Sequence, residues 1–377
     1  MPGDASGPGP IFIGSEIYRG SSYGPAHPLR VPRVSTVIDM CRAMDWFAPG
    51  QYRTSPRAKP QALHLWHDPD YITALQNAEH LSRAGDTLPP DYAARYGLGS
   101  LSNPAFPEMF RRPATGAGGV MLAAELLREG GVVHVPGGGT HHGLRGRANG
   151  FCYLNDVVLG MLVLRGHGIR RIAYIDIDAH HCDGVESAFA GDTEALLVSV
   201  HEDGRWPFSG RLEDDAGGNA FNLPVPAGFN DSEMRLVLDR LILPRVTAFR
   251  PEAVILQCGA DALSEDPLSR LCLSNNAHRA VVGALRPLCA RFLLLGGGGY
   301  NPWSVGRLWS ALWADLSGHA VPDVLPPAAQ TILGALSWGG GRRGAPEPAL
   351  LTTLADGPRE GPVRPAVQTA LDQLACR

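Results

Sequence analysis

One short segment of the sequence, "IDIDAHHCDG" at residues 175–184, holds several groups that could bind a metal ion. Asp176, Asp178 and His180 stand two residues apart, so on an extended strand they point to the same side. Carboxylate and imidazole groups bind divalent ions, and a catalytic zinc site has three protein ligands and an open position for water. We therefore predict a metal site formed by Asp178, His180 and a third ligand, Asp261, in "ILQCGAD".

The alternative for a lone Asp-x-His pair is a helix cap beside a surface histidine. Several other acids and histidines also follow predicted strands, and their convergence favours the metal site. Asp176 lies two residues deeper than Asp178, so we do not expect it to be a ligand. Its carboxylate is predicted either to orient an imidazole or to bind a monovalent cation.

Two adjacent histidines, His141 and His142, end the segment "GGGTHH". Glycines let the backbone approach a metal centre closely. A hydrolase needs a proton acceptor for the attacking water and a donor for the leaving group, and a histidine can serve as both. Asp176 and Asp183 are available to hold the two imidazoles. Taken alone, the pair would favour a second metal site or a surface loop; the glycines and nearby acids reverse that preference towards catalysis.

The remaining histidines lack such surroundings. His201 follows a buried strand and is expected to line the site without a catalytic role. We interpret the others as structural or surface residues, namely His64, His67, His80, His167, His181 and His278.

A tyrosine follows four glycines in "LLLGGGGYN", at residues 293–301. A loop without side chains can fold tightly against a metal site, and Tyr300 then offers a hydroxyl to a developing oxyanion. A phosphate-binding loop is the competing interpretation. It is rejected because the segment lacks the G-x-x-x-x-G-K-[ST] spacing and its lysine.

These groups need elements that carry them to one place. Five apolar runs are predicted to be buried parallel strands, at 131–136, 171–178, 195–201, 253–259 and 291–299. Helical patterns precede three of them, at 116–130, 154–168 and 231–249. Alternating strands and helices indicate an α/β fold with one parallel sheet covered by helices on both faces. Ligands bind such sheets beyond the carboxyl ends of the strands, where the polar residues lie.

The chain of 377 residues, 44% hydrophobic, is long enough to bury its core as one domain. Residues 1–10 are predicted to be disordered and 11–377 to form the domain. Within it, residues 320–377 are an appendage with a loop at 337–348 and a helix around 363–375. A net charge of −4 gives no reason to bind nucleic acid, and no apolar run is long enough for a membrane. The seven cysteines are scattered and form no C-x-x-C pair, which is typical of free thiols in a reducing compartment. The sequence also shows no signal peptide, so we expect a cytoplasmic enzyme.

Six segments together resemble the histone deacetylase family, especially its bacterial acetoin-utilisation and class I-like branch. They occur in the family's order, as "HPLRVPR" (27–33), "GGGTHH", "NGFCYLND" (149–156), "YIDIDAHHCDGVESAF" (174–189), "QCGAD" (257–261) and "LGGGGYN" (295–301). The resemblance implies the arginase–deacetylase fold, with zinc at the bottom of a narrow tunnel. It also implies a deacetylase whose substrate is an acylated amine.

The resemblance assigns roles to individual residues. Asp178, His180 and Asp261 match the zinc ligands, a set that also suits ferrous iron. His141 with Asp176 and His142 with Asp183 match two His–Asp pairs, with His142 as general base and then acid and Tyr300 as oxyanion donor. Two sites for K⁺ or Na⁺ are implied, an inner one at Asp176, Asp178, His180, Ser199 and Val200 and an outer one at Phe189, Asp192, Ala195 and Phe221.

The tunnel and its surroundings are matched in the same way. Gly150 and Phe151 match one wall, Leu268 matches the rim, and Arg33 matches an arginine of a cavity beneath the metal. The sequence departs from the family at Trp206, where phenylalanine is usual, and at Ser102, where the class I-like rim carries an acid. Leu101, beside it, stands where an aromatic residue is common. These departures disfavour a long peptide as substrate.

Two other functions compete with a zinc deacylase. A binuclear manganese ureohydrolase of the same fold would need a further acid two residues after Asp261, and "GADALSED" lacks it. A scaffold that only binds acylated amines would not need the catalytic residues, all of which are present. The substrate class stays open between acetyl-lysine proteins, acetylpolyamines and small acylated metabolites, and no pattern indicates an oligomeric state.

Overall fold

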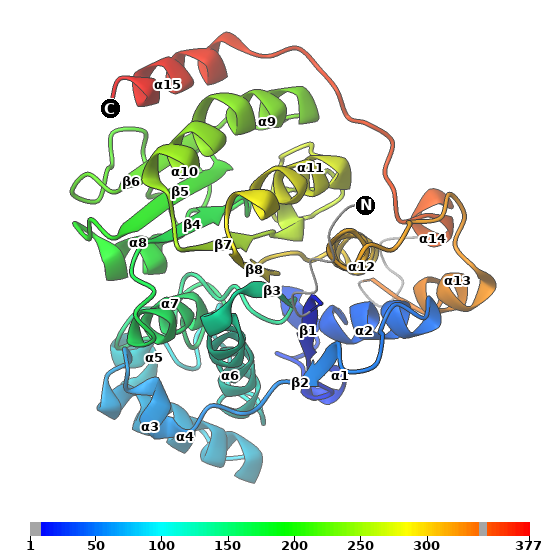
Figure 1. The fold of residues 1–377 in the computed structure, drawn as a ribbon. Helices are drawn as coiled ribbons and strands as arrows, with labels where there is room; N and C mark the ends of the chain where they lie inside the picture. Colours follow the sequence, from blue (N-terminus) through cyan, green and yellow to red (C-terminus); the bar gives the residue numbers. More distant parts are fainter. Residues whose placement is uncertain (1–8, 339–344) are drawn as a thin grey trace.

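The computed structural model describes residues 9–338 and 345–377. Its centre is a sheet of eight strands in the order β2-β1-β3-β8-β7-β4-β5-β6, and every neighbouring pair is parallel. Helices cover both faces of this sheet (Figure 1). The predicted α/β class, with a single parallel sheet between helices, is confirmed.

The strands run over Ile11–Gly14 (β1), Tyr52–Thr54 (β2), Gly131–Val135 (β3), Ile172–Asp176 (β4), Ala195–Glu202 (β5), Ala220–Val225 (β6), Ala253–Gln257 (β7) and Arg291–Leu295 (β8). The first helices are Ile17–Gly20 (α1), Val34–Ala43 (α2), Pro60–Leu63 (α3), Pro69–Ala84 (α4), Tyr92–Tyr96 (α5), Arg111–Leu126 (α6), Asp156–Gly166 (α7) and Asp183–Phe189 (α8). The later ones are Asp231–Val237 (α9), Leu243–Phe249 (α10), Asn275–Leu285 (α11), Pro302–Ser317 (α12), Pro327–Gly334 (α13), Ala349–Thr352 (α14) and Pro365–Ala375 (α15).

Alternate residues of the central strands point to two separate layers of core. In β4, Ala173 and Ile175 pack in a cluster with side chains of α2, α9, α11 and α12. Ile172 and Tyr174 pack on the opposite face with side chains of α6 and α7. Because both faces are buried, strand residues are apolar without alternation until each strand reaches its carboxyl end. Only there do polar side chains emerge, and this edge carries the site.

All five predicted strands are present; β5 is one residue longer than predicted, and the other four are one to four residues shorter. The predicted helices also form, although the segment 231–249 is α9 and α10 joined by a π-helical stretch at Leu238–Ile242. Three strands were missed. β1 and β2 are only four and three residues long, and β6 is an edge strand containing Pro224, which a central strand would not tolerate.

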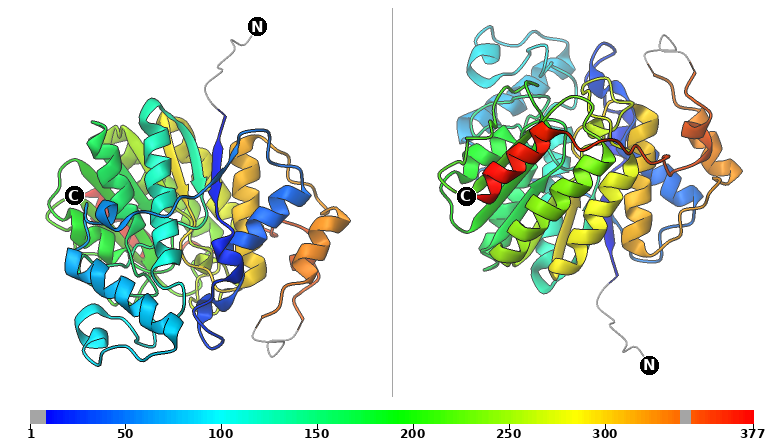
Figure 2. Two further views of the ribbon diagram at one scale, coloured as in Figure 1. Left: turned by 90° about the horizontal axis from the view of Figure 1, so that it is seen from below. Right: turned by 90° about the horizontal axis from the view of Figure 1, so that it is seen from above.

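The last part of the chain returns to the main body. Helix α15 lies alongside α9 and α10 (Figures 1 and 2) and buries Val367, Leu371 and Leu374 in the larger core cluster. The expected disorder at 1–10 falls mainly on residues 1–8, and half of the expected loop at 337–348 falls on 339–344, while its described residues form neither helix nor strand. Residues 1–8 and 339–344 lie outside the described residues. Within the described part of the chain, no helix is long and apolar enough to cross a membrane.

Candidate active site and metal centre

Three buried side chains converge beyond the ends of β4 and β7. Possible ligand atoms of Asp178, His180 and Asp261 all lie within 4.8 Å of one another. The Nδ1 atom of His180 is 3.2 Å from Asp178 Oδ1 and 3.0 Å from Asp261 Oδ2. The structure thus brings together the three predicted ligands, although 81 residues separate His180 from Asp261.

Glycines allow this close approach. A Cβ atom at Gly259 would lie 2.1 Å from Asp178 Oδ2, and one at Gly298 would lie 2.0 Å from Asp261 Oδ2. The backbone also fixes the carboxylates, because Gly298 N–H donates to Asp178 Oδ2 (2.6 Å) and Ala179 N–H donates to Asp261 Oδ1 (3.1 Å). Any side chain at either glycine would displace a ligand.

The charges of this group fit a bound cation. Burial alone would lower the pKa of His180, but its contacts with Asp178 and Asp261 raise that pKa to about 10. Two carboxylates this close in a buried setting repel each other, and burial with the charge of Asp178 raises the pKa of Asp261. A divalent ion would remove both penalties, and an Asp₂His set leaves a position open for water, as a catalytic site requires. The donor set therefore fits a single catalytic metal.

Each of the paired histidines has a carboxylate behind it. His141 Nδ1 lies 2.7 Å from Asp176 Oδ2, and His142 Nδ1 lies 2.6 Å from Asp183 Oδ1. With Nδ1–H turned to a carboxylate, Nε2 of the neutral ring is free to accept a proton. The predicted His–Asp pairs are therefore present as close contacts, and the His142 ring is 6.1 Å from the His180 ring, centre to centre.

The surroundings of His141 and His142 shift their pKa values in opposite directions. Burial works against the charged form of both, but Asp176 and Asp178 raise the pKa of His141 to about 9. Burial together with the charge of His141 lowers the pKa of His142 to about 4. At neutral pH this arrangement favours a cationic His141 beside a neutral His142, which can act as a base.

Asp176 has further partners that sequence reasoning missed. The hydroxyl oxygen of Tyr174 lies 2.5 Å from Asp176 Oδ2 and 2.8 Å from Gln257 Oε1, and its single proton is donated to one of these two acceptors. Tyr174 stands two residues before Asp176 on the same side of β4, so the alternation of the strand could have revealed it. These contacts fit the orienting role, one of the two roles predicted for Asp176, which stays a prediction.

Tyr300 is held beside the metal ligands by the glycine loop that follows β8. Its backbone N–H donates to Asp266 Oδ2 (2.6 Å), and Gly299 before it has φ +134°, a conformation that side chains disfavour. Its ring lies 5.8 Å from that of Phe151. Burial raises the pKa of Tyr300, so the phenol keeps its proton and can donate it in a hydrogen bond.

A tunnel of about 230 Å³ leads to this group. It is lined by Ser102, His142, Gly150, Phe151, His180, Arg205, Trp206, Leu268 and Tyr300. Trp206 packs so closely on Gly150 that a Cβ atom there would lie 2.1 Å from the indole. Of the predicted tunnel residues, Leu101 is absent from this lining and is 98% exposed. Arg205, which no motif indicated, lines the tunnel and is paired with Glu202.

The two predicted monovalent-cation sites differ in their surroundings. Asp176 and Ser199 of the inner site pair in register across β4 and β5. At the outer site, the carbonyls of Phe189, Asp192 and Ala195 converge on Asn219 Nδ2, which donates to them over 2.9, 3.1 and 3.1 Å. The amide nitrogen of Asn219 therefore bonds these three carbonyls, and the outer cation site stays a prediction; the fourth predicted residue, Phe221, is the second residue of β6.

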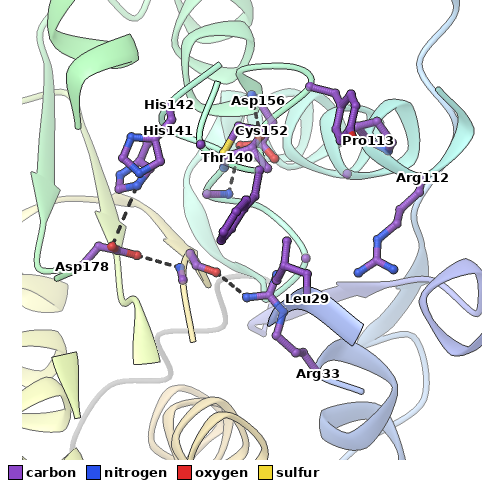
Figure 3. Close-up of a pocket in the computed structure, with 18 of the residues that line it drawn as sticks. Leu29, Arg33, Arg112, Pro113, Thr140, His141, His142, Cys152, Asp156 and Asp178 are labelled. Carbon is purple, nitrogen blue, oxygen red and sulfur yellow. Dashed lines mark hydrogen bonds and ion pairs between the residues drawn. The ribbon is translucent and has the colours of Figure 1, made fainter. Parts of the chain in front are cut away.

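Beyond the metal ligands, the space continues into a smaller cavity of about 60 Å³ (Figure 3). Arg33 lines it as predicted, and its Nη1 donates to Gly297 O (2.7 Å). A second arginine, Arg112 of α6, also lines it. No motif pointed to Arg112, since an arginine in the first turn of a helix has no signature of its own.

Comparisons with known proteins agree on one family. The family model described as "Histone deacetylase domain" matches residues 27–316. The chain is 33% identical over 332 residues to the acetoin utilization protein AcuC of Bacillus subtilis (strain 168), covering 84% of each. It is 34% identical over 316 residues to the putative histone deacetylase 2 of Caenorhabditis elegans, covering 81% of this chain and 61% of that protein.

Solved structures give the same result. The crystal structure of an HDAC homolog from Aquifex aeolicus matches with a TM-score of 0.91 and 35% identity, covering 97% of this chain and all of that one. An HDAC homolog complexed with SAHA matches with the same TM-score and identity.

Proposed function

Since this chain belongs to the histone deacetylase family and is a deacetylase, a hydrolase acting on an amide bond, we propose that it removes short acyl groups from small acylated amines with the help of one zinc ion. One observation carries the proposal. One residue of the metal-ligating group, His180, lines the same tunnel as Tyr300 and His142, and His142 is held by Asp183 behind it. Ferrous iron suits the same ligands.

Zinc held by Asp178, His180 and Asp261 would supply a Lewis acid that activates water and polarises the acyl carbonyl. The neutral His142 accepts the proton of the attacking water at Nε2 while Asp183 holds its Nδ1–H. Tyr300 donates a hydrogen bond to the carbonyl oxygen as negative charge develops there. His142 then passes its proton to the leaving amine, so one residue is both base and acid. The products are a carboxylate and a free amine.

A first test removes only the hydroxyl of Tyr300. We expect Tyr300→Phe to lower kcat by about 10²–10³, the scale for one oxyanion donor. Metal content should stay at the wild-type level because the hydroxyl is not a proposed ligand, and elemental analysis checks this. A variant that keeps near wild-type kcat would reduce Tyr300 to a packed aromatic.

The rim suggests which substrates are preferred. Ser102 lines the tunnel mouth with a neutral side chain, and its carbonyl oxygen accepts a hydrogen bond from His27 Nε2 (3.2 Å). The donor is Nε2 because His27 Nδ1 accepts from Leu29 N–H. No acid stands among the residues that line the tunnel, so nothing there accepts the backbone N–H groups of a peptide through a charge-assisted bond. Short acylated amines should therefore be better substrates than long peptides.

Ser102→Asp tests this interpretation of the rim. The substitution should raise kcat/KM for an acetyl-lysine peptide by about tenfold relative to a capped acetyl-lysine monomer, since hydrogen bonds to charged groups are the stronger ones. Ser102→Asn, of the same shape without the charge, is the matched control and should leave the ratio unchanged. A wild-type enzyme that already prefers the peptide tenfold would overturn the argument, as would an Asp variant without effect.

A further inference from the structure

The small cavity is an inward extension of the tunnel. The two spaces share His142, Gly150, Phe151, His180 and Tyr300, and only the cavity also reaches Asp178 and His141. An amide whose carbonyl meets Tyr300 and His142 must send its amine out through the tunnel. Its acyl tail must then point into the cavity. A volume of about 60 Å³ holds roughly four groups the size of a water molecule, so only a short tail fits.

Two guanidinium groups face this cavity without a carboxylate partner. Figure 3 shows Arg33 and Arg112 across the lining residues from His141 and His142. Among the described residues, neither has a carboxylate oxygen within 4.0 Å, whereas the buried Arg307 is paired with Asp356 at 2.7 Å. Arg33 Nε is also buried without a hydrogen-bond partner. Neither of these two positive charges is therefore paired directly with a carboxylate of the described residues.

The protein positions both charges without neutralising them. Arg112 Nη1 donates to Ser21 O (2.5 Å), and its guanidinium lies over the rings of Tyr18 and Tyr23 at 5.3 and 5.1 Å. Arg33 lies 5.3 Å from the ring of Trp309. Backbone carbonyls and aromatic faces hold a cation in place but carry no full charge to offset it. The arrangement is that of a preformed anion site.

The electrostatics agree with that geometry. Burial lowers the pKa of Arg112. The nearby Tyr23 raises that pKa, and the positive charge of Arg33 lowers it. Two like charges near one small cavity repel each other, and an anion between them relieves that repulsion. A carboxylate is well suited, because a guanidinium can bind its two oxygens through paired hydrogen bonds.

One acid also borders the cavity and has to be considered. Asp156 Oδ1 accepts hydrogen bonds from the backbone of Gly139 and Thr140, both at 2.9 Å, while Oδ2 has no hydrogen-bond partner in the described structure. Burial raises the pKa of Asp156, against the opposing effect of its hydrogen bonds with Thr140 and Gly139. Even when it is ionised, this single carboxylate offsets only one of the two guanidinium charges, so Asp156 does not cancel the preference for an anion.

We propose that the cavity binds the tail of a short acyl group ending in a carboxylate, of malonyl or succinyl size, and that the enzyme removes such groups from amines. This rests on the proposed function, since the same residues cleave the bond. Water adds its oxygen to the acyl carbon, the C–N bond breaks, the amine leaves with a proton, and the acyl group departs as a dicarboxylate. Arg33 and Arg112 are the specificity-determining residues, and no further reactant is required.

The test uses two acyl groups of equal shape on the same capped lysine. Malonyl and isovaleryl have the same branched skeleton, but malonyl ends in a carboxylate and isovaleryl in two methyl groups. We expect the metal-loaded wild-type enzyme to favour malonyl by about tenfold or more in kcat/KM, because an apolar tail leaves the two arginines unpaired. Arg112→Gln should bring this ratio down to about one. Arg111→Gln, which removes the neighbouring surface charge paired with Glu79, should keep the wild-type ratio.

The possible results distinguish a failure of this inference from a failure of the deacetylase proposal. Hydrolysis of acetyl-lysine with isovaleryl as good as malonyl would overturn this inference and leave the deacetylase proposal intact. Hydrolysis of none of these substrates would overturn both. The wild-type comparison needs no variant, so it holds even if Arg112→Gln fails to fold. Arg112→Lys, which keeps the charge but loses the paired hydrogen bonds, should give a ratio between those of the wild type and Arg112→Gln.

Discussion

Asp261→Asn is expected to abolish both metal binding and amide hydrolysis while leaving the chain folded. The fold should survive because an asparagine can keep the hydrogen bond from Ala179 N–H through its Oδ1 atom and place its amide where Asp261 Oδ2 now faces His180. The metal should be lost because a neutral amide replaces one of only two charged ligands. Loss of affinity should exceed the 10- to 100-fold typical of residues behind the ligands.

Thermal unfolding gives a readout that does not depend on activity. Zinc that binds only the folded state raises its stability, so a chelator should lower the Tm of the wild type and leave that of Asp261→Asn unchanged. The surface variant Asp315→Asn, which breaks an ion pair with Arg279, is the matched control and should respond to the chelator like the wild type. An Asp261→Asn protein that still binds one zinc and turns over substrate would remove Asp261 from the ligand set.

His142→Ala should be the most damaging substitution outside the metal ligands. His142 is the proposed proton carrier for both the attacking water and the leaving amine, and general acid–base catalysis contributes about 10²–10⁴ in rate. His141→Ala should cost less, because that residue is held beside Asp176 as a cation and acts through its charge. The measurement is kcat for both variants across the pH range.

The pH dependence separates the two roles. The low pKa of His142, about 4, keeps it a neutral base throughout the range above that value, and activity should fall as pH drops through it. The His142→Ala variant should lose this acidic limb, whereas His141→Ala should retain it. Equal damage from both substitutions, with the limb preserved in His142→Ala, would contradict the assignment.

Much of the site could be predicted because it follows the ends of buried strands. Runs such as "RIAYIDID" mark the strand, and parallel strands deliver their carboxyl ends to one edge, so Asp178, His180 and Asp261 were placed together from sequence. The two edge strands, β2 and β6, escaped notice because neither is a continuous apolar run, and β1 because it has only four residues. β2, with two of its three residues exposed, has no pattern that distinguishes it from a loop.

The residues that sequence reasoning missed act across long distances. Arg112 reaches the cavity from the first turn of α6, and Asn219 reaches three carbonyls where α8 connects to β5. Asp266 supports Tyr300 from 34 positions away. Each belongs to a residue type that is common on surfaces, and its role arises only from tertiary packing. The periodicity of the sequence therefore predicts site residues at the ends of strands. It does not predict site residues on loops and helices that are distant in sequence.

The central claim is that one metal ion per chain, held by Asp178, His180 and Asp261, supports hydrolysis of an acylated amine. Titration of metal-free protein with zinc, followed by the rate of acetyl-lysine hydrolysis, tests it most directly. The rate should rise in proportion to added zinc and level off at one ion per chain. A break at two ions, or full metal loading without release of acetate, would contradict the account and favour a binuclear enzyme of the same fold.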